Sequence, residues 1–201
     1  MTLKRPLALI IAFAAIASIL GQFYLNGSKP GLEPWGPRLW DMARYFTILT
    51  NALVAGVLLS EGFGHKAGPG WHMTGVINIT MVCLIYQTLL APPDPLQGLN
   101  WWTDFGFHLG VPVATLLWWM CFGPRDEPLR RMPLWLIWPV AYCLYALIRG
   151  GMTGSYPYFF LDVARFGALR IGLNIVGLVI VFGLAGAVIW GLGRLTRRFG
   201  R

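Results

Sequence analysis

Charged residues are scarce in this sequence. Asp, Glu, Lys and Arg make up only 12% of its 201 residues, whereas hydrophobic residues make up 56%. Because a soluble domain carries about 25% charged residues, this scarcity excludes an ordinary soluble protein and indicates an integral membrane protein. No segment between the apolar runs is long enough to bury a separate core, so we expect residues 1–201 to form one transmembrane domain.

Cysteine is also rare. Cys83, Cys121 and Cys143 each lie inside an apolar run, and none belongs to a CxxC pair. Isolated cysteines of this kind usually act as small buried hydrophobic residues. We therefore expect neither a disulfide nor a metal site.

Acidic residues are few as well, and the net charge is +8. The basic residues form no single patch. They are scattered over short loops and the C-terminus, where Lys and Arg orient membrane spans and meet anionic lipid. We therefore expect membrane lipids as partners, and no nucleic acid.

Long hydrophobic runs, in contrast, are abundant. A helix needs about 20 mainly apolar residues to cross a bilayer, and the sequence predicts an all-α bundle of six transmembrane helices. The first run also resembles a signal peptide, but it continues to Tyr24, so we expect it to be retained. The predicted spans cover approximately residues 6–25, 41–61, 71–91, 103–122, 132–148 and 169–192.

Six spans place both termini on one side of the membrane. Ten Lys and Arg residues lie on that side and six on the other. Because cytoplasmic loops carry the excess of basic residues, we expect both termini in the cytoplasm. The first group is Lys4, Arg5, Lys66, Arg125, Arg130, Arg131, Arg194, Arg197, Arg198 and Arg201; the second is Lys29, Arg38, Arg44, Arg149, Arg165 and Arg170.

The second predicted span carries a polar stripe. Arg44, Thr47 and Asn51 are spaced so that they share one face of a helix. Lipid cannot satisfy these groups. We therefore expect this face to point into the bundle, with Thr47 at its centre.

His108, in the fourth span, is predicted to lie at the same depth as Thr47. Each follows the outer start of its span by about five residues, which places both roughly 7–8 Å below the outer interface. A threonine hydroxyl becomes a nucleophile when a neighbouring base takes its proton, and imidazole suits that role near neutral pH. Thr47 and His108 are therefore the candidate catalytic pair, and either Asp104 or Asn51 could orient the imidazole.

Other polar groups also concentrate in the outer half. Oxyanion donors could come from Asn51, Asn174, Tyr156 or backbone N–H groups. Pairing with Arg165 explains Asp162 at least as well as substrate contact does. The candidates for supporting or substrate-binding roles are Asn51, Asp104, Arg44, Gln87, Arg149, Tyr156, Asp162 and Asn174.

Two further readings are weaker. Ser155 is a rival nucleophile in an outer loop, but no GxSxG motif surrounds it. A haem held between helices would need two histidines at matching depth, and only His108 lies in the outer half. We therefore expect no cofactor.

Three stretches of the sequence carry a resemblance to a known family. They are Tyr45-Phe46-Thr47-Ile48-Leu49-Thr50-Asn51, His108 with Val111-Pro112, and Gly154-Ser155-Tyr156-Pro157-Tyr158-Phe159-Phe160-Leu161-Asp162. Together with the number of spans, they resemble the androgen-induced-gene family of membrane proteins. That family includes the androgen-dependent TFPI-regulating protein and a bacterial branch, and the bacterial branch matches best.

The resemblance implies an activity and a location. Animal members hydrolyse fatty acid esters of hydroxy fatty acids with a threonine and a histidine, and the motifs carry these roles onto Thr47 and His108. Animal members follow the histidine with two threonines, whereas this chain has Leu109 and Gly110. We therefore expect an intramembrane threonine hydrolase of lipid esters, with its own specificity, in a bacterial inner membrane.

The alternative function is not enzymatic. The same polar cavity would suit a lipid-binding protein or a small transporter. Transporters usually show inverted repeats or helices broken at the midplane, whereas this sequence has no repeat and its polar groups lie toward one side. That disfavours transport and leaves lipid binding as the competing hypothesis.

Overall fold

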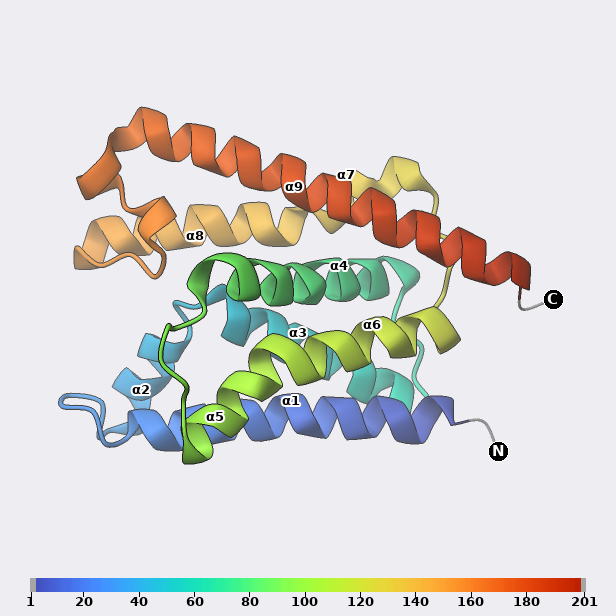
Figure 1. The fold of residues 1–201 in the computed structure, drawn as a ribbon, viewed down its shortest axis with the longest axis horizontal. Coiled ribbons are helices and arrows are strands. Elements are labelled where there is room, and N and C mark those ends of the chain that lie inside the picture. Colours follow the sequence, from blue (N-terminus) through green and yellow to red (C-terminus); the bar gives the residue numbers. More distant parts are fainter. Residues whose placement is uncertain (1–2, 200–201) are drawn as a thin grey trace.

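The computed structural model describes residues 3–199, and these residues form helices joined by short loops (Figure 1). Two segments are π-helical (η1 and η2) and two are short 3₁₀ turns (η3 and η4). In chain order the elements are α1 (Lys4–Asn26), α2 (Trp35–Met42), α3 (Phe46–Gly62), α4 (Pro69–Ile85), η1 (Tyr86–Leu90), α5 (Gly98–Phe105), η2 (Gly106–Gly110), α6 (Val111–Phe122), η3 (Leu129–Arg131), α7 (Met132–Trp135), α8 (Ile137–Thr153), η4 (Phe159–Leu161) and α9 (Val163–Phe199).

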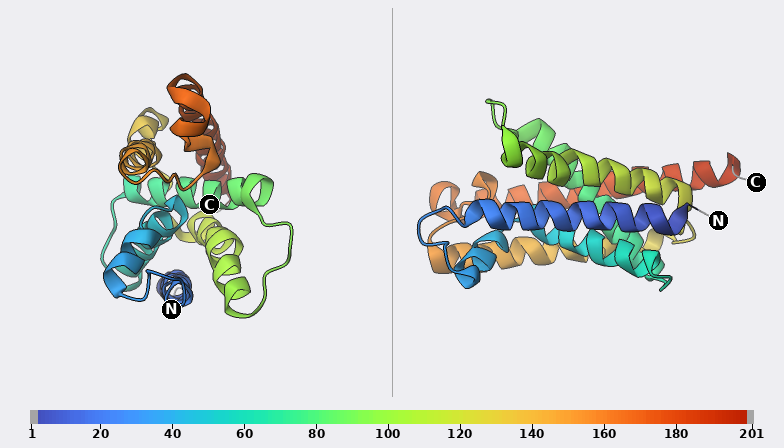
Figure 2. Two further views of the ribbon diagram at one scale, coloured as in Figure 1. Left: turned by 90° about the vertical axis from the view of Figure 1, so that its left-hand side faces the viewer. Right: turned by 90° about the horizontal axis from the view of Figure 1, so that it is seen from below.

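Helix α4 lies at the centre of the bundle. Helices α1, α3 and α6 lie on one side of it, and α8 and α9 lie on the other (Figures 1 and 2). Half of the most apolar stretch of α4 is buried in the protein, against 17% of that of α9. The apolar surface of α9 that the protein leaves uncovered is suited to contact with lipid.

The fold is all-α, as predicted, and it contains the expected apolar helices. Five helical stretches are long and apolar enough to cross a membrane, and the number rises to six if the bent pair of α2 and α3 counts as one span. Both ends of the chain lie at the same end of the bundle (Figure 1). Arg201 lies outside the described residues, and the side chains of Arg197 and Arg198 are not described.

The second predicted span is not one straight helix. Helix α2 ends at Met42, α3 begins at Phe46, and the two axes differ by 94°. Arg44 lies in the turn between them, so the prediction that it shares a helical face with Thr47 and Asn51 is wrong. Thr47 and Asn51 do share a face, because the Asn51 side-chain amide donates to the Thr47 carbonyl (2.9 Å).

Side chains of α8 hold this bend. The Tyr142 hydroxyl donates to the carbonyl of Arg44 (2.6 Å), and the Tyr145 hydroxyl donates to the carbonyl of Ala43 (3.1 Å). The Arg149 guanidinium donates to the carbonyl of Trp40 (2.5 Å) and lies 3.9 Å from the centre of the Trp40 ring. A helix that breaks inside a bilayer must place its freed carbonyls on other protein groups, and α8 supplies the donors.

We expect the Tyr142→Phe substitution to destabilise the protein by about 1 kcal/mol, because the carbonyl of Arg44 loses the hydroxyl that donates to it. Tyr142 is buried. Tyr24→Phe is the matched control, since Tyr24 is 74% exposed. Unfolding in detergent measures the difference between the variants. Equal stabilities would show that the hydroxyl does not hold the bend.

The structure contains two π-helical segments, η1 and η2. In η1 the N–H of Ala91 bonds the carbonyl of Tyr86 (2.8 Å), five residues earlier. In η2 the N–H of Val111 bonds the carbonyl of Gly106, and Pro112 follows without an N–H to offer. Such segments are rare and often occur at functional sites. Here they carry the side chains of Tyr86 and His108.

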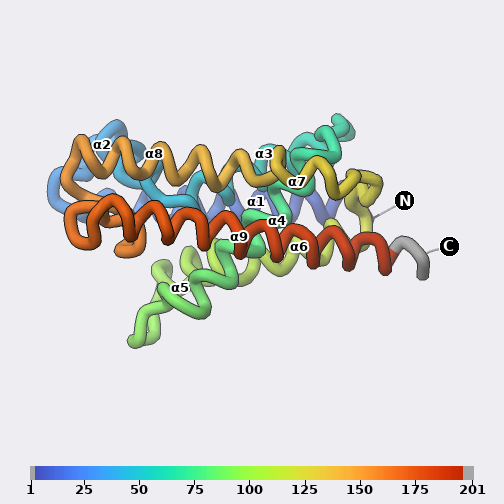
Figure 3. The backbone as a smooth tube through the Cα atoms, turned by 90° about the horizontal axis from the view of Figure 1, so that it is seen from above, coloured from blue at the N-terminus to red at the C-terminus, as the bar shows by residue number. Residues whose placement is uncertain are grey.

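Helix α9 runs along almost the whole bundle beside α8 (Figure 3). Its first turn is set off by Gly167, which has a positive φ of 75°. This conformation favours glycine because it lacks a Cβ atom. The loop before that turn, with η4, folds back over the bundle and brings Tyr158 toward the start of α3.

Candidate active site between two chambers

Thr47 lies in the first turn of α3. The first hydrogen bond of this helix joins the N–H of Leu49 to the carbonyl of Tyr45 (3.3 Å). The N–H groups of Phe46 and Thr47 therefore precede the helical ladder, and such groups are free to bind an oxygen atom. Asn51, which is fully buried, donates to the carbonyls of Thr47 (2.9 Å) and Phe107 (3.5 Å) and so ties α3 to η2.

His108 is held by Asp104 and Tyr86. Its Nδ1 lies 3.0 Å from the Asp104 carboxylate, which also accepts a hydrogen bond from the Tyr86 hydroxyl (2.5 Å). The Tyr86 ring stacks on the imidazole with 3.5 Å between centroids and 5° between planes. The sequence left Asp104 and Asn51 as alternatives for orienting this histidine, and the structure pairs it with Asp104. A proton on Nδ1 leaves Nε2 as the basic nitrogen.

Thr47 and His108 line the same cavity, which has a volume of about 320 Å³. We call it the polar chamber. Tyr45 and Phe107 also line it, as do three polar side chains from the end of α1 and the turn after it. Helix rise alone predicted a similar depth for Thr47 and His108, and the two residues do line one cavity.

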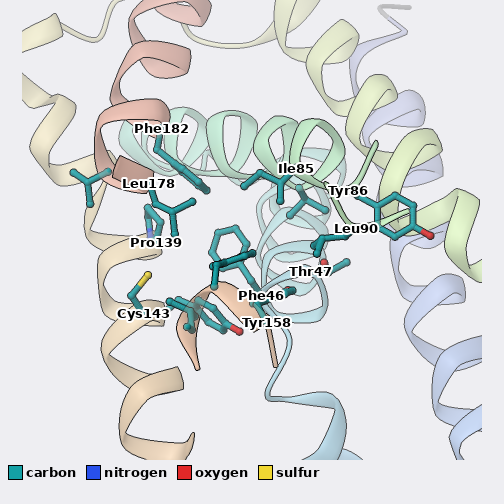
Figure 4. A pocket seen from close by; sticks show the side chains of 15 residues that line it. Phe46, Thr47, Ile85, Tyr86, Leu90, Pro139, Cys143, Tyr158, Leu178 and Phe182 are labelled. Atoms are coloured by element: carbon teal, nitrogen blue, oxygen red, sulfur yellow. The ribbon is translucent and has the colours of Figure 1, made fainter. Parts of the chain in front are cut away.

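A second cavity, the apolar chamber, adjoins the polar chamber at Thr47 (Figure 4). It is narrow, about 50 Å³, and its walls include Phe46, Pro139, Cys143, Leu178 and Phe182. Four residues line both chambers, and they are Thr47, Tyr86, Leu90 and Tyr158. The candidate nucleophile therefore lies where a polar space meets an apolar one.

The apolar chamber leads toward the lipid-facing side of the bundle. A groove of about 510 Å³ between η1 and α9 shares Ile85, Phe160 and Leu178 with the chamber wall. The groove continues over Leu89 and Phe166. An acyl chain that follows this path would stay in contact with apolar side chains from the bilayer to Thr47.

Tyr158, from the loop between α8 and α9, lines both chambers. Its hydroxyl lies within hydrogen-bonding reach of the Thr47 hydroxyl and of the backbone N–H groups of Phe46 and Thr47. Burial raises the pKa of Tyr158, so the phenol keeps its proton and remains a donor. Its ring stacks on Phe160 (5.2 Å, 3°), and Asn174 donates to the Phe160 carbonyl (2.9 Å), which fixes this loop.

Among residues 3–199, no hydrogen bond joins the Thr47 hydroxyl to the His108 imidazole. The two residues line the same chamber. Catalytic hydrogen bonds are often long before substrate binds and tighten in the complex. The arrangement therefore accommodates either a substrate or water between the two groups.

Most of the other predicted site residues lie away from both chambers. Arg44 pairs with Asp41 (3.0 Å) and reaches Ser155 (3.4 Å). Gln87 is exposed on η1. Arg149 clamps the end of α2, as described above. None of these three residues lines either chamber.

The remaining candidates belong to the loop between α8 and α9 and to α9 itself. The Tyr156 ring packs so closely on Gly150 that a Cβ there would lie 2.2 Å from it. Asp162 accepts the backbone N–H of Arg165 (3.0 Å), which caps the start of α9. Asn174 lines the groove rather than either chamber.

Sequence reasoning missed Tyr86, Tyr158 and the polar side chains of α1. The Tyr156-Pro157-Tyr158 triplet belongs to one of the stretches that carry the resemblance, but only the fold shows that Tyr158 lies beside Thr47. Tyr86 lies next to the predicted Gln87, one position away on a segment whose π-helical geometry changes the facing of each side chain.

No family model, curated protein or solved structure matches this chain. The assignment of function therefore depends on the geometry of the site and on the resemblance of its motifs.

Proposed function

We propose that this protein is a membrane-embedded hydrolase of lipid esters, with Thr47 as nucleophile and His108 as general base. One observation carries the proposal. Thr47 and His108 line the same polar chamber, and Thr47 also borders the apolar chamber. An ester that enters from the bilayer would place its acyl chain in apolar surroundings and its carbonyl beside a hydroxyl and an imidazole. The resemblance to the androgen-induced-gene family supports the same pair.

The proposed reaction has two halves. The Thr47 oxygen attacks the ester carbonyl carbon while Nε2 of His108 takes the hydroxyl proton. His108 then delivers that proton to the departing alcohol oxygen as the C–O bond breaks, which leaves an acyl-threonine. Water, deprotonated by His108, attacks this acyl group and restores the Thr47 hydroxyl. Asp104 keeps the imidazole oriented and stabilises its charged form.

Three donors are placed to stabilise the negative oxygen that forms on the carbonyl. They are the N–H groups of Phe46 and Thr47, which begin α3, and the Tyr158 hydroxyl, which lies within reach of both. Donors that are already fixed in a site shielded from water stabilise a developing oxyanion strongly. The substrate oxygen would take the place of the Thr47 hydroxyl beside the Tyr158 hydroxyl.

Lipid binding without turnover is the second candidate. The observation that favours it is the lack of a hydrogen bond between Thr47 and His108 among the described residues. In that case the chambers would store or present a lipid, and the His108–Asp104 pair would serve packing alone. The experiment below separates the two.

Covalent labelling tests the proposal. A lipid-like fluorophosphonate, added to the protein in nanodiscs, is expected to modify Thr47, because its phosphorus takes the position of the ester carbonyl. Mass spectrometry locates the adduct. The His108→Ala variant is expected to label more than about 100-fold more slowly, while Ser155→Ala labels like the wild type. An adduct on Ser155 would move the nucleophile to the loop between α8 and α9, and no adduct on a folded protein would favour lipid binding without turnover.

We also propose that both termini face the cytoplasm of a bacterial inner membrane. The two ends of the chain lie at one end of the bundle (Figure 1), where basic residues are in excess. A reporter that folds only in the cytoplasm, fused to the C-terminus, is expected to be active, and one that needs the periplasm is expected to be inactive. The reverse pattern would place the site in the inner leaflet.

A further inference from the structure

The polar chamber has a second polar wall that the proposed reaction does not use. Gln22 and Asn26, one turn apart near the end of α1, line the chamber, and so does Lys29 in the following turn. The Gln22 side-chain amide donates to the side-chain oxygen of Asn26 (2.9 Å), and Asn26 is only 2% exposed. Polar side chains at the end of a membrane helix lie where lipid head groups lie.

Lys29 is the only Lys, Arg, Asp or Glu among the described residues that line this chamber. No ion pair holds its ammonium group among residues 3–199. Asp104 does not line this chamber, and its carboxylate is already bonded to His108 and Tyr86. The part of the wall formed by α1 and the turn after it therefore carries a positive charge without an ion-pair partner, together with amide groups, and this is the chemistry that recognises an anion.

The direction in which an ester binds decides which of its two parts, acyl or alcohol, contacts this wall. If the carbonyl lies at Thr47 and the acyl chain occupies the apolar chamber, the alcohol part must extend into the polar chamber. That chamber, about 320 Å³, is at the lower end of the volumes of small-molecule sites. Its polar lining of Gln22, Asn26 and Lys29 suits a compact polar head group better than a second long chain.

We propose that the substrate is a single-chain acyl ester of a small anionic alcohol, and that Lys29, with the amides of Gln22 and Asn26, binds its phosphate or carboxylate. This inference rests on the proposed function for the direction of the ester. The anion site itself depends only on the chamber and its lining.

Turnover of matched esters tests the inference. The substrates share an oleoyl chain and differ in the alcohol, which is glycerol, glycerol 3-phosphate or glycerate. The protein is placed in nanodiscs of neutral lipid so that surface charge does not bias partitioning. Wild-type protein is expected to favour the two anionic esters over the neutral one by roughly tenfold in kcat/KM. A preference for only one of them would identify the anion as phosphate or as carboxylate.

Lys29→Gln removes the positive charge and keeps an unbranched polar side chain. It is expected to lower turnover of the preferred anionic ester to within about twofold of the neutral ester. Both lysines are exposed, and Lys66→Gln is the matched control because Lys66 lies in the loop between α3 and α4 and does not line the polar chamber. Equal rates for neutral and anionic esters, or equal effects of the two variants, would overturn the inference.

A binding measurement separates failure of the inference from failure of the hydrolase proposal. Ether analogues, oleyl glycerol and oleyl glycerol 3-phosphate, cannot be hydrolysed, and native mass spectrometry measures their affinity for each variant. If wild type hydrolyses no ester but binds the phosphate analogue more tightly than Lys29→Gln does, the anion site stands and the hydrolase fails. Equal binding by the two proteins would refute the anion site whether or not esters are hydrolysed.

Discussion

The Thr47→Val variant is expected to lose lipid-ester hydrolysis by on the order of 10⁴-fold in kcat. Valine keeps the branched shape of threonine and its preferred χ1 angle, so the first turn of α3 and both chamber walls keep their form. Only the nucleophilic oxygen is removed. His108, Tyr158 and the N–H groups remain. The residual rate therefore measures direct attack of water on the bound ester, without an acyl-enzyme.

Thr47→Ser is the matched variant. Serine restores the hydroxyl and loses only the methyl group, so its rate is expected to stay within roughly tenfold of wild type. Release of oleate, with unfolding in detergent as the check on folding, distinguishes the two proteins. If Thr47→Val turns over esters as Thr47→Ser does, Thr47 is not the nucleophile and the chambers only bind lipid.

The positions of the long helices follow from composition and length. Apolar runs of about 20 residues predict membrane helices because a bilayer leaves the backbone no other partner for its hydrogen bonds. The predicted runs at 6–25 and 71–91 correspond to α1 and to α4 with η1. Where a run was bounded by Pro and Gly, helices extend further into the loops than predicted, as α5 does from Gly98.

The break between α2 and α3 could not be predicted from local sequence. No proline or glycine lies in the turn at Ala43–Tyr45. The turn persists because donors almost 100 residues later in the chain, Tyr142 and Tyr145, take its carbonyls. Tertiary contacts of this kind override local helix propensity. The break matters for the site, since it makes Thr47 part of a helix start rather than a helix interior.

The spacing of residues in the sequence predicts side-chain pairs within one helix, but it does not predict contacts between helices. The Asp104–His108 pair is one turn apart and follows from helix geometry. The stacking of Tyr86 on His108 depends on how two π-helical segments face each other. The approach of Tyr158 to Thr47 depends on a loop anchored by Asn174. Each needs the packed bundle, so the sequence alone named the catalytic candidates and not their surroundings.

The Tyr158→Phe variant is expected to lower kcat by roughly 10²-fold with little change in KM. Phenylalanine keeps the ring, its stacking on Phe160 and the walls of both chambers. It removes the hydroxyl that lies beside Thr47 and the free N–H groups of α3. A donor that meets its acceptor only as the carbonyl becomes an oxyanion stabilises the transition state more than the bound ester, and its loss therefore appears in kcat.

Tyr156→Phe is the matched control, two residues away in the same loop. Its ring packs on Gly150 and lines neither chamber, so kcat is expected to stay within about twofold of wild type. Steady-state rates for one ester, with stability measured on the same samples, separate chemistry from folding. If Tyr158→Phe raises KM and leaves kcat unchanged, the hydroxyl holds bound lipid and the two N–H groups of α3 alone serve the oxyanion.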